Sequence, residues 1–342
     1  MTDTPPEHKR RPRYSGKNPR NFDEKYKELQ PERYADDIAK VLARGDTPAG
    51  SHRSIMKAEM LQVLKLQPGE TAVDATLGYG GHARVMLAAL RPGGKLYGLD
   101  VDAQELPKTE LRMRAAGFNE QEFIARQLNF AALPQLLAEE GLTGVDALFA
   151  DLGVSSMQID NPRRGFTFKR LGPLDLRMNP LKGEPASALL VKLEEAQLAQ
   201  LLRDNADEVY AGQIAREISA RRGEINTTTA LAAAVHAATP AGEGDDPVRR
   251  TFQALRIAVN GEFSALDTLL AVLPYCMNPG GRAAFITFHS GEDRRVKQAF
   301  KVGLEQGLYS TVADEVLRPN NIERYSNPRS AAAKMRWAIR AE

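Results

Sequence analysis

One stretch in the first third of the chain constrains its fold more than any other. Residues 71–75 have the short apolar run of a buried strand, and a glycine-rich loop, residues 77–81, follows directly. Residues 82–90 have the spacing of a helix, and residues 95–99 form a second expected strand that ends on Asp100. A strand, a glycine loop, a helix, a strand and an acid in this order predict one unit of a parallel sheet.

The rest of the chain continues this alternation and then interrupts it. Further strands are expected at residues 121–124, 147–150 and 282–287, with helices between them. Residues 186–240 contain no strand pattern, and their leucines recur at helical spacing, whereas residues 242–247 resemble a linker. We therefore predict a Rossmann-like α/β fold, with a mostly parallel sheet and an all-helical insertion between its fourth and fifth strands.

The glycine loop by itself is compatible with two kinds of cofactor. Such a loop lets a ligand approach the backbone closely, because glycine has no side chain to block it. The spacing Gly78-x-Gly80-x-x-Ala83 satisfies the dinucleotide fingerprint, and Asp100 follows it by about 20 residues, where an acid binds ribose. A nicotinamide-dependent oxidoreductase and an S-adenosylmethionine-dependent enzyme both remain open at this point.

Two further acids favour S-adenosylmethionine. Asp74 ends the first strand, and Asp151 follows a later strand and precedes a small polar segment, residues 152–156. Ligands of open α/β sheets bind at the carboxyl ends of the strands. A carboxylate there suits the amino and sulfonium groups of S-adenosylmethionine and would repel a pyrophosphate. The alternatives are a helix cap for Asp74 and a turn acid for Asp151.

The charge of the chain is unevenly distributed, although its net value at pH 7 is only +2. Residues 8–20 contain many Lys and Arg and no acid, and the stretch from Arg318 to Arg340 holds more bases than acids. Basic ends on a nearly neutral protein would suit a polyanion such as a nucleic acid. The alternative for residues 1–20 is a solvated, disordered tail.

Other features limit the classes of protein that remain. The single cysteine, Cys276, excludes a disulfide framework, and the five histidines lack ligand spacing, so we expect no bound metal. No apolar run approaches the roughly 20 residues of a membrane span, and the N-terminus lacks a signal-peptide core. We therefore expect a cytoplasmic protein without a membrane partner.

Several blocks of the chain match one known family in order. They are residues 52–56, 74–82, 151–160, 164–168, 172–178, 250–257, 288–294 and 327–330. With these blocks the chain resembles the ribosomal RNA small subunit methyltransferase H family, also called MraW. Members of that family methylate N4 of a cytidine in the decoding region of 16S rRNA.

The resemblance implies a class I methyltransferase with S-adenosyl-L-methionine as its cofactor and 16S rRNA or the small ribosomal subunit as its partner. The residues that would bind the cofactor are Gly80, Gly81, His82, Asp100, Phe130, Asp151 and Gln158. By resemblance, the first three would hold the methionine end, Asp100 would bind the ribose hydroxyls, and Phe130 would lie against the adenine.

The resemblance also divides the chain into three parts. Residues 51–162 and 248–342 would form the S-adenosylmethionine-binding methyltransferase domain, and residues 163–247 a helical insertion that helps to bind RNA. Residues 1–50 would be a basic, partly disordered extension without a counterpart in typical members. The sequence leaves a homodimer open.

A catalytic hypothesis follows from the implied substrate. The exocyclic amine of cytosine is a poor nucleophile, so the enzyme must extract the base and give the departing proton an acceptor. We expect Asp151 to accept a hydrogen bond from N4, and Ser155 with its neighbour Ser156 to orient the base. His289 would contact the substrate or accept the proton; the alternative is a structural histidine bonded to one of the acids that follow it.

A further set of side chains would serve the RNA. The basic residues Arg163, Arg164, Lys169, Arg170 and Arg177 cluster in the sequence and would suit phosphates. Phe166 or Phe288 would stack on the base, although core packing is the more common role of phenylalanine.

Other functions stay open on the sequence alone. The glycine spacing permits the nicotinamide-dependent oxidoreductase. A methyltransferase of the same fold would act on another RNA or on DNA if the insertion and the tails select a different substrate. Gly291 stands where the family usually has Leu, which leaves open an inactive RNA-binding assembly factor.

Overall fold

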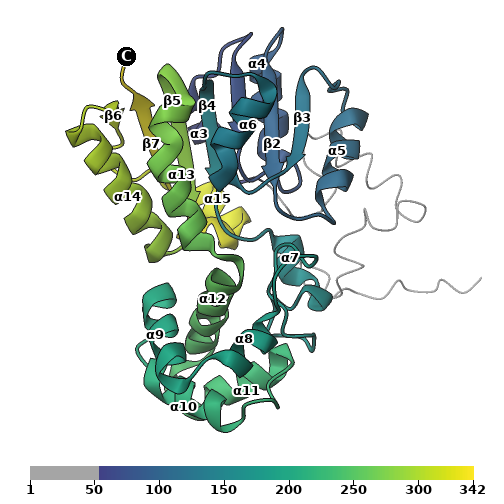
Figure 1. Ribbon diagram of the computed structural model, residues 1–342, viewed down its shortest axis with the longest axis vertical. Helices are drawn as coiled ribbons and strands as arrows, with labels where there is room; N and C mark the ends of the chain where they lie inside the picture. The colour runs from purple at the N-terminus through teal and green to yellow at the C-terminus, as the bar shows by residue number, and fades with distance from the viewer. Residues whose placement is uncertain (1–53) are drawn as a thin grey trace, which may run out of the picture. The chain divides into compact units, whose positions relative to one another are not determined.

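A seven-stranded sheet runs through residues 54–342, the part of the chain that the computed structural model describes (Figure 1). Its strands are β1 Thr71–Asp74, β2 Lys95–Asp100, β3 Phe123–Gln127, β4 Val145–Asp151, β5 Met277–Thr287, β6 Tyr309–Val312 and β7 Lys334–Arg340. They lie in the order β3-β2-β1-β4-β5-β7-β6; the first five are parallel, and β7 is antiparallel to β5 and β6. The predicted Rossmann-like, mostly parallel sheet is confirmed. The extension predicted at residues 1–50 lies outside the described residues.

The middle of the sheet determines where a ligand can bind. β1 pairs with β2 on one side and with β4 on the other, so the strand order reverses between β1 and β4. Ala72, Val73 and residues 147–150 are completely buried, which explains the apolar runs of these two strands. In an open α/β sheet such a reversal leaves a crevice outside the carboxyl ends of the strands.

Helices cover both faces of the sheet (Figure 1). On one face lie α3 Lys57–Leu64, α4 Gly81–Leu90 and α5 Leu106–Ala115; on the other lie α6 Leu133–Glu140, α13 Glu262–Cys276 and α14 Ser290–Glu305. α4 is typical, because Ala83, Met86, Leu87 and Leu90 recur at helical spacing and are all fully buried.

The insertion between β4 and β5 has an apolar core of its own. Its helices are α8 Ala186–Lys192, α9 Glu195–Ala206, α10 Ala211–Ala220, α11 Thr228–Ala238 and α12 Asp246–Asn260. Phe166, Leu202, Ile214 and Phe252 belong to this core, which is distinct from the two cores that flank the sheet. The predicted all-helical insertion is therefore confirmed. Two further short helices are α7 Ser156–Asp160, which follows β4, and α15 Asn321–Ser326, which precedes β7.

The linker expected at the end of the helical insertion is not a linker in the structure. Residues 242–247 form a short turn and the start of α12. Phe252 of α12 packs into the helical core, whereas Leu266 of α13 packs against the sheet. α12 therefore belongs to the helical insertion, and its periodic apolar face explains why it packs there. The insertion ends at Gly261, between α12 and α13, and not at residue 247.

α12 and α13 are also the helices to consider when asking whether the chain could span a membrane. Between residues 54 and 342, no single helix is both long and apolar enough to span a membrane. α12 and α13 together pass by length and composition, with a bend of 60° between them. Their apolar residues, such as Leu255 and Leu269, are buried in the protein cores.

Candidate functional site

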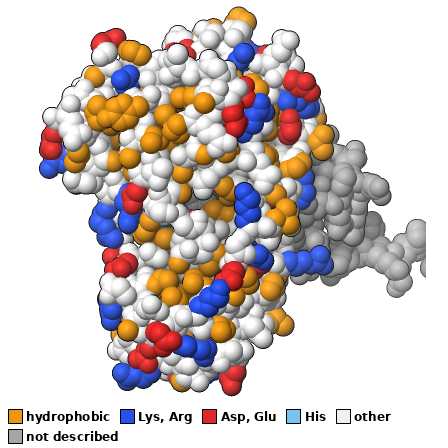
Figure 2. All heavy atoms as spheres, viewed as in Figure 1, with side chains coloured by type: hydrophobic (Ala, Val, Ile, Leu, Met, Phe, Trp, Pro, Cys, Tyr) orange, Lys and Arg blue, Asp and Glu red, His pale blue; other side chains and the backbone are white. Residues whose placement is uncertain are grey.

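The carboxyl ends of β1, β2 and β4 open into a cavity of about 520 Å³. Its wall on the sheet side includes Gly78, Asp100 and Asp151, and the opposite wall includes Met178 and Asn260. Figure 2 shows a hollow between the sheet and the helical layer, with apolar side chains around it. The cavity lies where the strand order places a ligand site, and its volume suits a small molecule.

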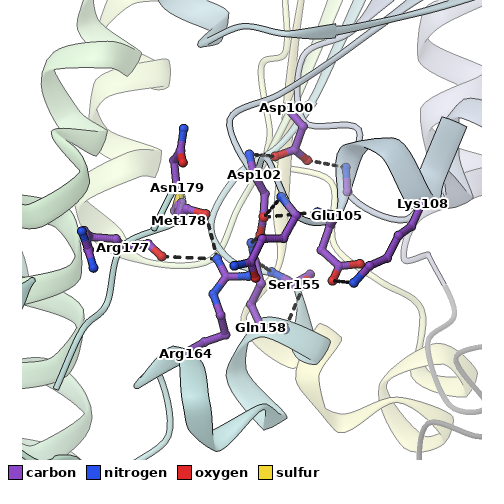
Figure 3. A network of polar contacts seen from close by, with 12 residues as sticks. Asp100, Asp102, Glu105, Lys108, Ser155, Gln158, Arg164, Arg177, Met178 and Asn179 are labelled. Carbon is purple, nitrogen blue, oxygen red and sulfur yellow. Dashed lines mark hydrogen bonds and ion pairs between the residues drawn. The ribbon is translucent and has the colours of Figure 1, made fainter. Parts of the chain in front are cut away.

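Asp100 ties the glycine loop to the end of β2. Its Oδ2 accepts a hydrogen bond from the backbone N–H of Gly78 at 2.8 Å, and its Oδ1 accepts one from the N–H of Asp102 at 2.8 Å (Figure 3). Burial raises the pKa of Asp100 to about 6, although these hydrogen bonds act in the opposite direction. Asp100 lines the cavity, which is the position expected of a ribose-binding acid.

Two carboxyl groups stand at the ends of β1 and β4. Asp74 accepts a hydrogen bond from the N–H of Thr76 at 3.2 Å, and the N–H of Asp151 donates to the hydroxyl of Thr76 at 2.6 Å. Within the described residues, Oδ2 of Asp74 and Oδ1 of Asp151 are buried without a hydrogen-bond partner. Only Asp151 lines the cavity, so Asp74 lies behind it.

Burial disfavours the ionised form of both carboxyl groups, and the charge of Asp74 adds to this effect on Asp151. Burial raises the pKa of Asp74 to about 7. Burial, and secondly the charge of Asp74, raise the pKa of Asp151 to about 8. In residues 54–342 no cluster of three or more His, Cys, Asp or Glu side chains could hold a metal ion.

The cavity wall begins earlier in the glycine loop than the resemblance implies. Gly78 and Tyr79 line it, whereas Gly80 and Gly81 lie at the start of α4 and are not part of the wall. Gly80 has a φ of 77°, and an added Cβ would lie 3.0 Å from Sδ of Met113. Glycine is therefore required there for the shape of the loop.

His82 is buried beneath the site and does not line it. Its Nε2 lies 2.8 Å from the carbonyl oxygen of Ile55, and its ring packs on Phe149 with 4.5 Å between centroids. Burial lowers the pKa of His82 to about 4. Its Nδ1 is 3.7 Å from Oδ2 of Asp151, beyond hydrogen-bond distance, so His82 packs behind the carboxyl group without bonding it.

Phe130 lies at the cavity, where the adenine contact is expected. Gln127, the last residue of β3, and the two residues after it line the wall beside Phe130. The side chain of Asn129 accepts a hydrogen bond from the N–H of Ala131 at 2.9 Å and thereby fixes the turn. Phe130 packs on the sheet core and gives the cavity a flat aromatic surface.

Ser155 and Gln158 line the cavity, but their polar atoms are engaged within the protein. The Ser155 hydroxyl accepts a hydrogen bond from the N–H of Gln158 at 3.2 Å, and the Gln158 side chain accepts one from the N–H of Ser155 at 2.9 Å. This capping box starts α7. The Gln158 amide also donates to Oδ2 of Asp102 at 2.8 Å (Figure 3). The Ser155 hydroxyl only accepts in this cap, so its own hydrogen could still be donated to a base while α7 keeps its first turn.

His289 lies outside the cavity wall, so the geometry gives its expected catalytic role no direct support. It is the N-cap of α14: its Nδ1 accepts a hydrogen bond from the N–H of Glu292 at 3.4 Å, and its Nε2 lies 3.1 Å from Oε1 of Glu292. Burial acts to raise the pKa of Glu292, but the hydrogen bond and charge of His289 bring it below its usual value. The neighbours Phe288 and Glu292 line the cavity, so the alternative, a structural histidine, fits the geometry.

One site residue, Asp102, lies outside the sequence-based expectations. Its side chain is 1% exposed and forms an ion pair with Nη1 of Arg164 at 2.8 Å. Arg164, expected to meet phosphates, is therefore buried, and Arg177 pairs with Asp175 at 2.7 Å. The signal for Asp102 was present in the sequence, because a second acid follows the predicted ribose-binding acid two positions later.

Comparison with known proteins assigns almost all of the described part of the chain to one family. The model of the MraW methylase family matches residues 49–341. Ribosomal RNA small subunit methyltransferase H 1 of Lachnoclostridium phytofermentans is 49% identical over 98% of this chain and 94% of its own length. The protein of that name from Agathobacter rectalis is 47% identical over 98% of this chain and 99% of its own length. Ribosomal RNA small subunit methyltransferase H of Halorhodospira halophila is 42% identical over 88% of this chain and 97% of its own length.

The comparisons bear on the expectation that residues 1–50 lack a counterpart in typical members of the family. A match that covers 98% of the chain includes most of this extension, so it has a counterpart in the first two relatives. The third relative covers 88% of the chain and leaves more of it unmatched. The extension therefore belongs to some members and not only to this chain.

Proposed function

This chain belongs to the MraW methylase family, and on that premise we propose that it methylates N4 of a cytidine in the decoding region of 16S rRNA. One observation carries the proposal: Asp151 stands at the end of β4, in the cavity wall, with a buried Oδ1 that no described residue engages. An exocyclic amine that gains a methyl group must lose a proton. Asp151 offers an acceptor for that proton, and its pKa of about 8 lies close to neutral.

The residues of the sheet edge fit S-adenosylmethionine. Asp100 would accept the ribose hydroxyls, and Phe130 would lie against the adenine. Burial raises the pKa of Asp74 to about 7 and that of Asp151 to about 8, and the positive charges of the amino and sulfonium groups would favour their ionised forms. When bound, S-adenosylmethionine supplies an electrophilic methyl group.

The chain's own residues would then position the base. Asp151 would accept a hydrogen bond from N4. This bond would take the nitrogen lone pair out of conjugation with the ring and hold N4 in line with the methyl group. As the methyl group leaves the sulfonium and joins N4, one proton would pass from N4 to Oδ1 of the ionised Asp151, so the positive charge of the sulfonium and the negative charge of the carboxylate would both be neutralised. Phe288 and Phe263 line the cavity nearby and would exclude water from the reacting atoms.

Basic side chains would bring the RNA to this cavity. Arg163 and Lys169 are exposed at the edge of the insertion, and Arg177 and Lys182 line the cavity wall. Charges of this kind bind phosphates without reading sequence, so they would orient the RNA while the cavity selects the base. The names of the relatives agree with ribosomal RNA of the small subunit as the substrate.

The proposal is tested by methyl transfer and by mapping. Purified protein, labelled S-adenosylmethionine and small ribosomal subunits lacking the modification should yield label on N4 of one cytidine of the decoding region. Asp151→Asn should reduce transfer by about 100-fold or more, the range of a lost proton acceptor. Asp146→Asn is the matched control, because Asp146 lies on the same strand but bonds Thr71 and Asn278 at its other end.

Three results would overturn this reading. Full activity of Asp151→Asn would remove the proton acceptor from the mechanism. Label on another nucleotide, another RNA or DNA would change the substrate. Tight binding of the subunit without transfer would favour an assembly factor.

A further inference from the structure

The guanidinium of Arg164 joins two walls of the cavity without lining it. Its Nη1 donates to Oδ2 of Asp102 at 2.8 Å, and its Nη2 donates to the carbonyl oxygens of Met178 at 2.7 Å and Arg177 at 3.3 Å (Figure 3). The side chain is only 9% exposed. A cation this deeply buried is retained only with such partners, so its position is fixed by both walls at once.

One of these walls is the cofactor side of the cavity. Asp102 follows the predicted ribose-binding acid on the same turn, and its N–H donates to Oδ1 of Asp100 at 2.8 Å. Oδ1 of Asp102 accepts a hydrogen bond from the N–H of Gln104 at 3.0 Å. Both carboxylate oxygens of Asp102 therefore accept hydrogen bonds. A ligand that fixes the position of Asp100 would also fix that of Asp102, which accepts the hydrogen bond from Arg164.

The opposite wall is a constrained turn, residues 176–179. Leu176 has a φ of 65°, in a region that a non-glycine residue adopts only where its surroundings enforce it. Asn260 of α12 provides one constraint: its Nδ2 donates to the carbonyl oxygen of Leu176 at 2.8 Å, and its Oδ1 accepts from the N–H of Met178 at 2.7 Å. Arg164 provides the other, through the carbonyl oxygens that follow Leu176.

We propose that Arg164 is a positioning residue through which cofactor binding at Asp100 and Asp102 orders residues 176–179 on the opposite wall. Met178 and Asn179 line the cavity, so this turn would form part of the surface against which the methylated base lies. The inference rests on the proposed function in taking S-adenosylmethionine as the cavity's ligand. A planar fork of donors is essential, because a lysine in this position reaches one wall or the other but not both.

Hydrogen exchange followed by mass spectrometry tests the link with S-adenosylhomocysteine as the probe. In the wild-type protein, the probe should slow exchange of the glycine loop and also of residues 176–179. In Arg164→Lys, protection of the glycine loop should remain while protection of residues 176–179 is lost. Asp102→Asn keeps the shape of the acceptor without its charge and should give the same result if Arg164→Lys fails to fold.

The matched control is Arg282→Lys. Arg282 makes a comparable set of bonds, to the carbonyl oxygen of Leu64 at 2.7 Å and to both oxygens of Glu70 at 2.8 and 2.6 Å, but at the other edge of the sheet. It should leave protection at both cavity walls as in the wild type. Equal protection of residues 176–179 in Arg164→Lys, or none in the wild type, would overturn the proposal.

Kinetics provide a second readout that a purely structural role would not change selectively. In Arg164→Lys, KM for the RNA should rise by at least about fivefold, a typical coupling between two ligands, while the affinity for S-adenosylhomocysteine changes less. An unchanged KM for RNA, or an equal loss for both ligands, would count against the positioning role. If the wild-type protein transfers no methyl group, the proposed function fails, yet the exchange experiment still decides the role of Arg164.

Discussion

Nε of Arg336 donates a 2.7 Å hydrogen bond to Oδ1 of Asp293, across 43 positions of the sequence. Lys334 adds a second bond to the same carboxylate, at 2.9 Å. Burial acts to raise the pKa of Asp293, but the two cations bring it below its usual value. These basic residues hold β7 to α14, so the basic C-terminal stretch is not, at these positions, the polyanion-binding patch that its composition suggests.

Arg336→Met should therefore lower the free energy of unfolding by about 3 kcal/mol. Removing one partner of a buried pair leaves the other charge uncompensated, and Lys334 keeps the loss at the low end of the usual range. Urea denaturation measures the loss. Arg318→Met, at an exposed position, is the control and should change stability by less than about 0.5 kcal/mol. A fall in RNA affinity without a fall in stability would restore the polyanion role.

Gly165 should tolerate alanine much less than Gly183 does. Both have positive φ angles, 75° and 70°, but a Cβ on Gly165 would lie 2.3 Å from the carbonyl oxygen of Pro173, whereas a Cβ on Gly183 meets nothing within 4 Å. Gly183→Ala should cost about 1 kcal/mol from the backbone alone. Gly165→Ala should cost about 1–3 kcal/mol more because the turn must open. Equal losses in urea denaturation would show that the close approach is unimportant.

The central sheet was predictable because its strands are buried on both faces. β1 and β4 read as apolar runs, and their order along the chain follows from the alternation with helices. β7 was not predicted, since Lys334, Arg336 and Arg340 hide its strand pattern from a reading of the sequence. Asp293, the partner of Lys334 and Arg336, is remote in sequence, and only the folded chain brings it close to these two cations.

The acidic residues of the candidate site could be predicted from the sequence, but the hydrogen bonds that surround them could be predicted less well. Asp100 and Asp151 end strands, so the sheet topology alone brings them to one cavity. His289 also follows a strand, but its ring caps the start of α14, where it accepts a hydrogen bond from the N–H of Glu292. Arg164 reads as a surface base because the sequence does not reveal Asp102 as its buried partner.

His289→Asn should keep methyl transfer within about threefold of the wild type. Asparagine is as good an N-cap as any residue, so α14 keeps its first turn, whereas His289→Ala should lose about 0.5–2 kcal/mol of stability. Initial rates and thermal melts on the same preparations separate the two effects. A loss of about 100-fold in rate for His289→Asn at unchanged stability would make His289 a proton acceptor after all.

Asp151→Asn should stabilise the protein at pH 8 while it abolishes activity. Burial raises the pKa of Asp151 to about 8, whereas an aspartate in an unfolded chain titrates near 4. Between these two values the folded state holds a proton that the unfolded chain has lost. The stability from this site is therefore fully present below about pH 4 and lost as the pH rises through about 8.

Asparagine is neutral at every pH, so the difference in melting temperature between Asp151→Asn and the wild type should be small at pH 5. It should grow to a few degrees at pH 8. Asp146→Asn should show no such growth, because Asp146 bonds the N–H of Thr71 and the amide of Asn278 outside the cavity. A parallel pair of melting curves from pH 5 to pH 8 would mean that Asp151 is ionised throughout. In that case the pKa of Asp151 would lie below the range tested, and its carboxylate would be a much weaker base toward the proton of N4 than its burial implies.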